Sequence, residues 1–478
     1  MTSSALNAAT AVTADLARLI EALRAELGPQ AVFAGAEVPV RNHNDYSGLP
    51  VSPPGGLVRP ADTAGVALTL RRCAELGVSV VPQGGLTGLC GGARAGAQQL
   101  ALSLERLVGI EEIDPASATM TVLSGTPLET VQQAAAEAGF FCPLDLGARG
   151  SCAIGGNLAT NAGGNRVIRY GMARDMVLGL EVVLPDGAVI TSLNKMIKNN
   201  AGFDLKHLFI GSEGTLGVIT RVVLRLFPKP ASTQLALCAV PDYAGVLALL
   251  DSARRRMGPL LSAFEVMWPA YWQFATTRVA GVRNPLQGDD RPHGAYVLVE
   301  ALGTDEQQDA ARFEAWLADL MEAGAVSNAA MAQSLADVKA FWAVRDATAE
   351  LHTQLPQHLA FDVGLPVARM DDYVSRCRQA LQARIPNACT LFYGHVGDGN
   401  LHIIVHQAGV AEQPKSLVDG IVYGLVREYG GTVSAEHGIG TLKRPWLGHA
   451  RSPAEIALMQ TLKQALDPRG VLNPGKVI

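Results

Sequence analysis

The sequence predicts an α+β protein with two domains and a boundary near residue 229. Before that point, short apolar runs typical of strands are separated by loops rich in Gly and Asn. The segment Pro228–Thr233 interrupts this pattern, and after it strands alternate with long amphipathic stretches. A chain of 478 residues is long enough for two to four domains, at roughly 100–200 residues per domain.

The N-terminal region predicts a helix followed by one β-α-β crossover. Thr13 can cap the helix and Gly28-Pro29 ends it. Five apolar residues lie at helical spacing in between: Leu16, Leu19, Ile20, Leu23 and Leu27. The crossover comprises a strand near Val58–Pro60, a helix over Asp62–Leu76 and a strand at Val78–Pro82. Further strands in this half are expected at Leu100–Leu104, Thr119–Leu123, Val177–Leu184, Ala188–Ile190 and Gly217–Phe227.

The second half predicts a sheet whose strands are connected by helices. Strands are expected at Leu235–Val240, Ala295–Glu300, His358–Leu365, Thr390–His395 and His402–His406. The amphipathic stretches that predict helices are Tyr243–Met257, Thr304–Ala323 and Met370–Ile385. A last helix is expected at Pro453–Leu466.

The composition argues against several classes of function. The chain has 39 Lys and Arg against 44 Asp and Glu, so no positive surplus is left for a phosphate backbone and nucleic acid is not an expected partner. Seven scattered cysteines without a C-x-x-C pair favour structural thiols in a reducing cytoplasm. We expect no signal peptide and no spanning helix, because no apolar run reaches about 18 residues. Peripheral contact with the inner membrane stays open.

Three Gly-dense segments in the first half favour a bound phosphate. They are Pro82–Ala93, Gly150–Asn157 with its continuation Asn161–Asn165, and Gly211–Gly217. In such segments backbone N–H groups can converge on an anion, because no side chain blocks the approach. One segment alone would more often be a tight turn, but three together favour a ligand. The P-loop and Rossmann patterns are both absent, so the phosphate is expected to bind mostly to loop amides.

These segments resemble the FAD-binding domain of the vanillyl-alcohol oxidase superfamily. Within it, the chain is similar to the D-2-hydroxy-acid dehydrogenases, which include D-lactate dehydrogenase, the glycolate oxidase flavin subunit and D-2-hydroxyglutarate dehydrogenase. The further motifs that carry the resemblance are Gly147–Gly171, Lys198–Leu205, Gly394–His402, Ser434–Thr441 and Asn473–Lys476. The resemblance implies a two-lobed FAD-binding domain made of residues 1–228 and the C-terminal return 436–478. Residues 229–435 would form an α+β substrate cap with an antiparallel sheet.

The resemblance also implies which residues bind FAD. No His occurs between His43 and His207, so the binding is expected to be non-covalent. The expected cofactor-binding residues are Pro82, Gly84, Gly85, Leu86, Thr87, Gly88, Gly91, Gly92, Gly150, Ser151, Gly155, Gly156, Asn157, Asn161, Gly163, Gly171, Glu213, Gly214, Gly217, Val218, Ile219 and Asn473.

Two histidines and a glutamate form a candidate metal site. His395 and His402 frame a Gly-Asp-Gly-Asn loop, and Glu436 lies in a second Gly-flanked turn. Two imidazoles and a carboxylate are a usual ligand set for a divalent ion. The spacing alone, however, favours a metal site no more than it favours histidines that are buried and hydrogen-bonded within the protein. The resemblance favours the metal, because related dehydrogenases place one, commonly Zn2+, on the matching positions.

The chemistry implied by the resemblance requires a base and a carboxylate-binding group. When an alcohol loses a hydride to flavin N5, its hydroxyl proton must also leave, and a neutral imidazole near pH 7 can accept it. His437 is the predicted base, and Asn400 would add a polar contact to the substrate or the flavin. Arg345 matches the family position that holds a substrate carboxylate, although an Arg on a helix is usually solvated or ion-paired.

The predicted function is FAD-dependent oxidation of a D-2-hydroxy acid to the 2-oxo acid. D-2-hydroxyglutarate dehydrogenases have a Thr and a Lys where this chain has Ala349 and Ala360, which favours D-lactate or a longer apolar monocarboxylic acid. D-2-hydroxyglutarate is the alternative substrate. A metal-dependent hydrolase is the alternative from another class, and an ether-lipid synthase would require a histidine-rich run that we do not find.

The expected partners are therefore a small 2-hydroxy acid and an electron acceptor, which is a quinone, a cytochrome or an electron-transfer flavoprotein. A homodimer is one assembly that the sequence leaves open.

Overall fold

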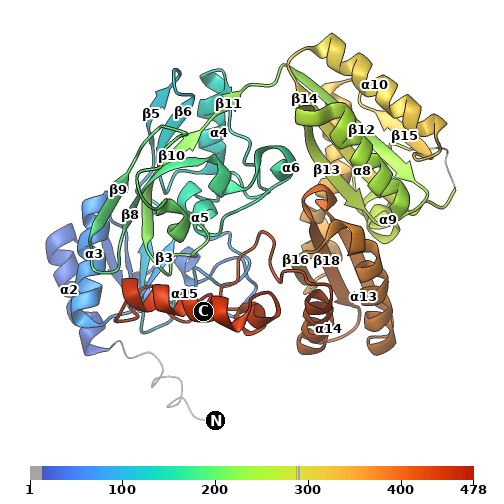
Figure 1. The fold of residues 1–478 in the computed structure, drawn as a ribbon. Coiled ribbons are helices and arrows are strands. Elements are labelled where there is room, and N and C mark those ends of the chain that lie inside the picture. Colours follow the sequence, from blue (N-terminus) through green and yellow to red (C-terminus); the bar gives the residue numbers. More distant parts are fainter. Residues whose placement is uncertain (1–12, 287, 289–290) are drawn as a thin grey trace. The chain divides into compact units, whose positions relative to one another are not determined.

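The chain forms two compact units in a computed structural model that describes residues 13–286, 288 and 291–478 (Figure 1). The first unit comprises residues 1–164, 172–229 and 436–478, and the second comprises residues 165–171 and 230–435. The expected domain 1–228 begins with residues 1–12, which lie outside the described residues. The assignment of cofactor binding to the first unit and of substrate binding to the second unit is a prediction.

The first unit contains a four-stranded sheet in the order β1-β2-β4-β3. Its strands are β1 Val32–Ala34, β2 Gly56–Val58, β3 Val80–Gln83 and β4 Leu100–Ser103. β2 and β3 both run parallel to β4, and β1 is antiparallel to β2. Helix α3 (Thr63–Leu76) connects β2 to β3, so the predicted crossover is confirmed.

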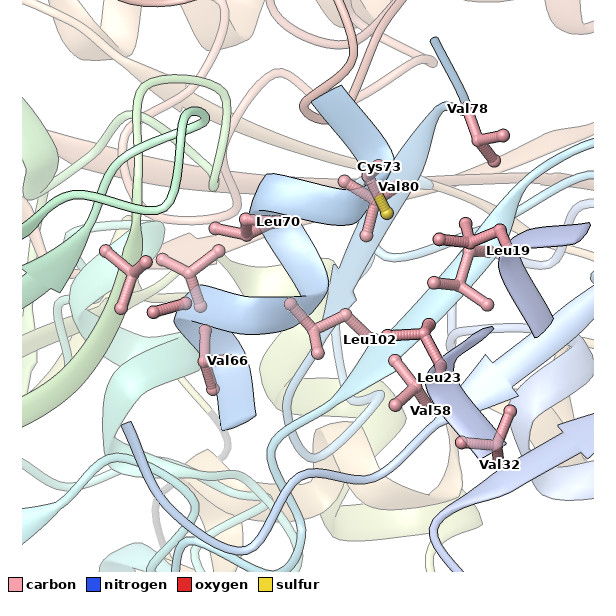
Figure 2. Close-up of a cluster of buried hydrophobic side chains, with 14 of the residues drawn as sticks. Leu19, Leu23, Val32, Val58, Val66, Leu70, Cys73, Val78, Val80 and Leu102 are labelled. Carbon is pink, nitrogen blue, oxygen red and sulfur yellow. The ribbon is translucent and has the colours of Figure 1, made fainter. Parts of the chain in front are cut away.

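Helices α2 (Ala14–Leu27) and α3 supply much of the apolar core of this sheet. The Thr13 side chain caps α2 by accepting a hydrogen bond from the backbone, and Gly28 ends the helix with a positive φ of 86°. Figure 2 shows Leu19 and Leu23 of α2 in one cluster with Val58, and all three are fully buried. The helix that the apolar spacing predicts is therefore confirmed.

A five-stranded antiparallel sheet forms the other lobe of the first unit, in the order β5-β6-β10-β8-β9. Its strands are β5 Ile110–Asp114, β6 Thr119–Leu123, β8 Val177–Val183, β9 Val189–Ser192 and β10 Val218–Arg225. The short strands β7 (Phe140–Phe141) and β11 (Phe227–Pro228) pair with each other.

The expectation that only loops separate these strands is wrong for α4 (Leu128–Glu137). Leu128, Val131 and Ala135 lie at helical spacing and are buried, so packing stabilises a regular helix there. Two shorter helices, α5 (Ile154–Ala159) and α7 (Lys206–Phe209), also interrupt the loops. The C-terminal return contains α15 (Pro453–Leu466) as predicted, begun by a capping box of Ser452 and Glu455.

The second unit is built on a seven-stranded sheet in the order β15-β12-β14-β13-β17-β18-β16. Its strands are β12 Ser232–Val240, β13 Leu261–Met267, β14 Ala295–Gly303, β15 Asn328–Met331, β16 Leu359–Gly364, β17 Ala388–Gly394 and β18 Asn400–Gln407. Every pairing is antiparallel. The predicted α+β class and the antiparallel sheet of the second domain are thus confirmed.

Helices cover both faces of this sheet. They are α8 Tyr243–Met257, α9 Pro269–Arg278, α10 Glu306–Glu322, α11 Leu335–Arg345, α12 Leu351–Gln354, α13 Met370–Arg384 and α14 Lys415–Glu428. α9, α11 and α12 share one apolar cluster with Leu237, Met267 and Leu298 of the sheet. α8 and α10 pack on β12, and α13 packs on β17 and on α14. No helix within the described ranges is long and apolar enough to cross a membrane.

The segment Asn165–Gly171 leaves the first unit and packs in the second. It contains the short helix α6 (Val167–Tyr170). Arg166 forms an ion pair with buried Glu300 of β14, with 2.9 Å between Nε and Oε1, and Ser262 donates a hydrogen bond to the same carboxylate. The predicted boundaries did not separate this segment, because its Gly- and Asn-rich flanks resemble the neighbouring loops.

Candidate active site

The glycine-rich loops of the first unit lie against one another. A Cβ on Gly85 would come within 2.0 Å of the Ser151 carbonyl oxygen, and a Cβ on Gly214 within 3.2 Å of Pro82. Bare backbone is required at Gly85, because two loops from separate parts of the sequence meet there. The structure thus brings together the three segments that the sequence predicts to hold a phosphate.

The loop after β3 presents unused backbone donors. Among the described residues, the N–H groups of Gly85, Leu86, Thr87 and Gly88 have no hydrogen-bond acceptor. These residues are half-buried, and Leu86 adopts a left-handed φ of 61°. Successive free amides around a left-handed residue form a concave site for an anion. The loop therefore has the chemistry needed to hold a pyrophosphate.

Glu213, an expected cofactor-binding residue, uses its carboxylate inside the protein. It accepts hydrogen bonds from the backbone N–H groups of Ile439, at 2.6 Å, and Gly440, at 2.8 Å. Burial raises the pKa of Glu213, although these two N–H groups and the charge of Lys443 act in the opposite direction. The side chain therefore holds the C-terminal turn, and the expected contact of Glu213 with a cofactor stays a prediction.

Two expected cofactor-binding asparagines also support loops. Asn473 donates through Nδ2 to the carbonyl oxygens of Gly92, at 3.1 Å, and Glu213, at 2.7 Å. Asn161 accepts through Oδ1 from the N–H of Arg174 at 3.0 Å. These contacts tie the Gly-rich segments to one another and to the C-terminal return. Gly171, by contrast, belongs to the second unit.

The C-terminal return carries Glu436 and His437 on a tightly held turn of the first unit. A Cβ on Gly163 would approach Glu436 Oε1 to 2.5 Å, so the return packs against the stretch Asn161–Asn165. The N–H of Thr441 donates to Cys90 O at 2.8 Å, and the Cys90 thiol donates to Gly438 O at 3.3 Å. With Glu213 on the other side, the backbone that carries His437 has a fixed position.

In the second unit, buried polar groups gather on the four neighbouring strands β13, β17, β18 and β16 and on the residues that follow them. His395 follows β17 and is 3% exposed, and His402 lies in β18 and is 8% exposed. Their ring centroids are 5.4 Å apart. His402 lies opposite Asp362 of β16 in the register, and Asp362 is fully buried. Two imidazoles at this separation are a usual pair of ligands for one divalent ion.

Glu265 of β13 connects this group to Arg345, the last residue of α11. The distance from Glu265 Oε1 to His395 Nδ1 is 2.5 Å, and that from Glu265 Oε2 to Arg345 Nε is 2.9 Å. Arg345 Nη2 lies 3.0 Å from His395 Nε2. Burial alone would raise the pKa of Glu265, but its interactions with His395 and Arg345 lower it to about 2. The carboxylate is therefore ionised at neutral pH.

The side-chain amide of Asn400 is hydrogen-bonded at its nitrogen but not at its oxygen. Its Nδ2 donates to Asp362 Oδ1 at 2.8 Å, and its buried Oδ1 has no partner among the described residues. Asp362 Oδ2 accepts from Ser434 Oγ at 3.1 Å and from the N–H of Ala435 at 3.2 Å. Asp362 thus fixes both Asn400 and the chain immediately before Glu436.

Glu265 and Asp362 were not predicted as site residues from the sequence. Glu265 lies in a strand that is buried on both faces, so its run Leu-Ser-Ala-Phe-Glu-Val-Met shows no alternation that would mark it. A charged residue inside such an apolar run was the available signal, since buried carboxylates are rare unless paired. Ala349 and Ala360 are both exposed in the second unit and carry no polar group.

Comparison with known families gives the identity of both halves. The model described as "FAD binding domain" matches residues 54–192, and the model described as "FAD linked oxidases, C-terminal domain" matches residues 229–477. Among solved structures, p-cresol methylhydroxylase has a TM-score of 0.76 at 16% identity and covers 98% of this chain and 97% of its own. An alkyldihydroxyacetonephosphate synthase has a TM-score of 0.73 at 16% identity, and the match covers 96% of this chain and 84% of the synthase. These likenesses show the fold alone.

Curated relatives are similar over most of the chain. The D-2-hydroxyglutarate dehydrogenase of Xanthomonas citri pv. viticola is 37% identical over 429 residues, which is 89% of each chain. The mitochondrial D-2-hydroxyglutarate dehydrogenases of Arabidopsis thaliana and Bos taurus are 38% and 39% identical over 422 residues, 88% of this chain and 74% and 76% of theirs. The chain therefore belongs to the FAD-linked oxidase family and is an FAD-dependent D-2-hydroxy-acid dehydrogenase.

Proposed function

We propose that this enzyme oxidises a monocarboxylic D-2-hydroxy acid, D-lactate or a longer apolar analogue, to the 2-oxo acid. The observation that carries the proposal is the Arg345 guanidinium, which is 11% exposed, combined with neutral side chains at Ala349 and Ala360. One guanidinium suits one carboxylate, and a second carboxylate without a cation would be desolvated at a cost. D-2-hydroxyglutarate is the second candidate, because relatives at 37–39% identity bear its name.

FAD would bind non-covalently to the first unit, with its pyrophosphate on the amides of Gly85–Gly88. The unused N–H groups of this loop and the bare backbone at Gly85 support this placement. When bound, FAD accepts the hydride released by the substrate.

His395, His402 and Glu436 would hold a divalent ion, which we propose is Zn2+. The donor set suits such an ion, and Glu265 at His395 Nδ1 leaves Nε2 as the ligand nitrogen. Glu436 follows Ala435, whose backbone is held by Asp362. The ion would supply Lewis acidity that lowers the pKa of the substrate hydroxyl.

The remaining roles belong to single side chains. His437 would accept the hydroxyl proton, Arg345 would bind the C1 carboxylate, and the unpartnered Oδ1 of Asn400 would accept a hydrogen bond from the substrate. Electrons would leave to a quinone, a cytochrome or an electron-transfer flavoprotein. A cytoplasmic location is supported by cysteine chemistry, because the seven cysteines are free thiols and six of them are buried.

The other two candidate functions have less support. A metal-dependent hydrolase would not need the glycine-rich loops. The chain also belongs to a flavoprotein family, which argues against a hydrolase. The likeness to an alkyldihydroxyacetonephosphate synthase is one of fold at 16% identity.

The flavin site can be tested with two glycines of the first unit. Gly85→Ala should give protein with greatly reduced flavin absorbance, because its Cβ would meet Ser151 O at 2.0 Å. Gly448→Ala is the control, since it lies outside the cofactor-binding loops and nothing lies within 4 Å of its added Cβ. The measurement is the flavin-to-protein absorbance ratio after purification. Equal flavin content in the two variants would contradict the assignment of this loop.

The metal site can be tested by elemental analysis of purified protein. His395→Ala and Glu436→Ala should each lose bound Zn2+ while flavin content stays unchanged. His406→Ala is the control, because it changes another histidine of β18 that has no proposed role. Fully active wild-type enzyme without any divalent ion would remove the metal from the mechanism.

His437 and Arg345 should give different kinetic phenotypes. His437→Ala should lower kcat by roughly 10²–10⁴ with little change in flavin content, because it removes a general base. Arg345→Ala should act mainly through KM, because a charge-assisted bidentate contact to the substrate is lost. Steady-state kinetics with an artificial electron acceptor separate the two effects. An unchanged kcat in His437→Ala would assign the base to another group.

Substrate choice can be tested with a panel of D-2-hydroxy acids. D-lactate or a longer apolar acid should exceed D-2-hydroxyglutarate in kcat/KM. The double variant Ala349→Thr, Ala360→Lys should shift the preference towards D-2-hydroxyglutarate by restoring the polar and cationic groups of that family. If wild-type enzyme prefers D-2-hydroxyglutarate, another cation completes the site.

A further inference from the structure

Glu265 contacts both His395 and Arg345. In the proposed function, His395 binds the metal ion and Arg345 binds the substrate carboxylate. Each of its carboxylate oxygens has one partner, His395 Nδ1 at 2.5 Å and Arg345 Nε at 2.9 Å. The Glu265 side chain is 1% exposed and that of Arg345 is 11% exposed, so water does not compete for these bonds. One carboxylate therefore sets the position of both the metal ligand and the carboxylate-binding group.

The contact with Glu265 also decides which nitrogen of His395 can bind an ion. An ionised carboxylate accepts a hydrogen bond, so Nδ1 must carry the proton. In a neutral imidazole the other nitrogen, Nε2, then carries the lone pair. This is the arrangement in which a carboxylate orients a metal-binding histidine.

Arg345 reaches the same nitrogen from the other side. Its Nη2 lies 3.0 Å from His395 Nε2, at hydrogen-bond distance. Because Nε2 has a single lone pair, it can accept from Arg345 or bind a metal ion, but not both at once. Metal binding therefore takes one acceptor away from Arg345, while Glu265 still holds the guanidinium through Nε.

We propose that Glu265 is a positioning residue through which metal binding at His395 makes an N–H of Arg345 available to the substrate carboxylate. The inference rests on the proposed function, in which His395 binds the metal and Arg345 the substrate. Two other groups lie near the guanidinium: Asp346 Oδ1 is 3.6 Å from Nη1, and the Tyr393 ring centroid is 5.7 Å from Cζ. Once a metal ion occupies His395 Nε2, Nη2 can donate to a new acceptor.

The coupling must be reciprocal. If a metal ion increases the affinity for a carboxylate ligand, the ligand must increase the affinity for the metal by the same factor. Zn2+ and pyruvate, a 2-oxo acid, serve as the probes, because pyruvate presents the carboxylate without being oxidised. Zn2+ affinity of the flavin-containing enzyme would be measured by competition with a chromogenic chelator, with and without pyruvate.

Wild-type enzyme should bind Zn2+ several-fold more tightly in the presence of pyruvate. Glu265→Gln should weaken Zn2+ binding by about 10–100-fold and remove the effect of pyruvate, because an amide cannot accept from both partners. Arg345→Ala should bind Zn2+ at least as tightly as wild type, since a competitor for Nε2 is gone, and should also lose the effect of pyruvate.

Glu300 provides a matched control on the neighbouring strand. Its side chain is on the same sheet face as Glu265, two residues along the register, and it also pairs with an arginine, Arg166, in a buried position. Glu300→Gln should lower thermal stability but keep both the Zn2+ affinity and the pyruvate effect. A role of Glu265 in stability alone would make the two variants behave alike.

The outcomes separate the inference from the proposed function on which it rests. If Glu265→Gln keeps wild-type Zn2+ affinity, or if Arg345→Ala weakens Zn2+ binding, the coupling is wrong while the metal site stands. If Glu265→Gln does not fold, the Arg345→Ala result decides alone. If wild-type enzyme binds no Zn2+, the metal assignment itself fails and the inference with it.

Discussion

A carboxylate buried in an apolar sheet is stable only when hydrogen-bonding or oppositely charged groups contact it. The candidate site of the second unit depends on this constraint. Glu265 lies in a strand whose seven residues are all buried. Its ionised form is stable there only because Arg345 and His395 face its two oxygens. Removing either partner would leave one oxygen of the carboxylate without its hydrogen bond. The same requirement that stabilises the carboxylate therefore fixes the geometry of both functional side chains.

The first unit uses a buried carboxylate in a different way. Glu213 is held by the backbone N–H groups of Ile439 and Gly440. Burial raises its pKa, whereas charge pairing lowers that of Glu265 to about 2. Glu213 anchors the turn that carries His437. In both units, a side chain without a role in the reaction thus determines where a candidate catalytic group lies.

Most secondary structure and the chemistry of the glycine loops could be predicted from the sequence. α8 and α15 match their predicted ranges, because amphipathic spacing and capping residues are local properties. β13 was missed because a strand buried on both faces has no alternation. The contact between Glu213 and Ile439 was not predicted, because a glutamate in a Gly-rich motif gives no local sign that its partner lies 226 residues away.

By itself the sequence determined the fold class, which follows from periodicity, and the flavin family, which follows from the resemblance of its ordered motifs to known dehydrogenases. Only the tertiary structure decided which residues meet. Arg345 and His395 are separated by 50 residues, and each is separated by more from Glu265. The contact of Glu265 with His395 depends on strand order and register in a seven-stranded sheet, and the packing of α11 on that sheet brings Arg345 to it. Such pairing is a long-range property, since it is set by which strands become neighbours rather than by any local pattern.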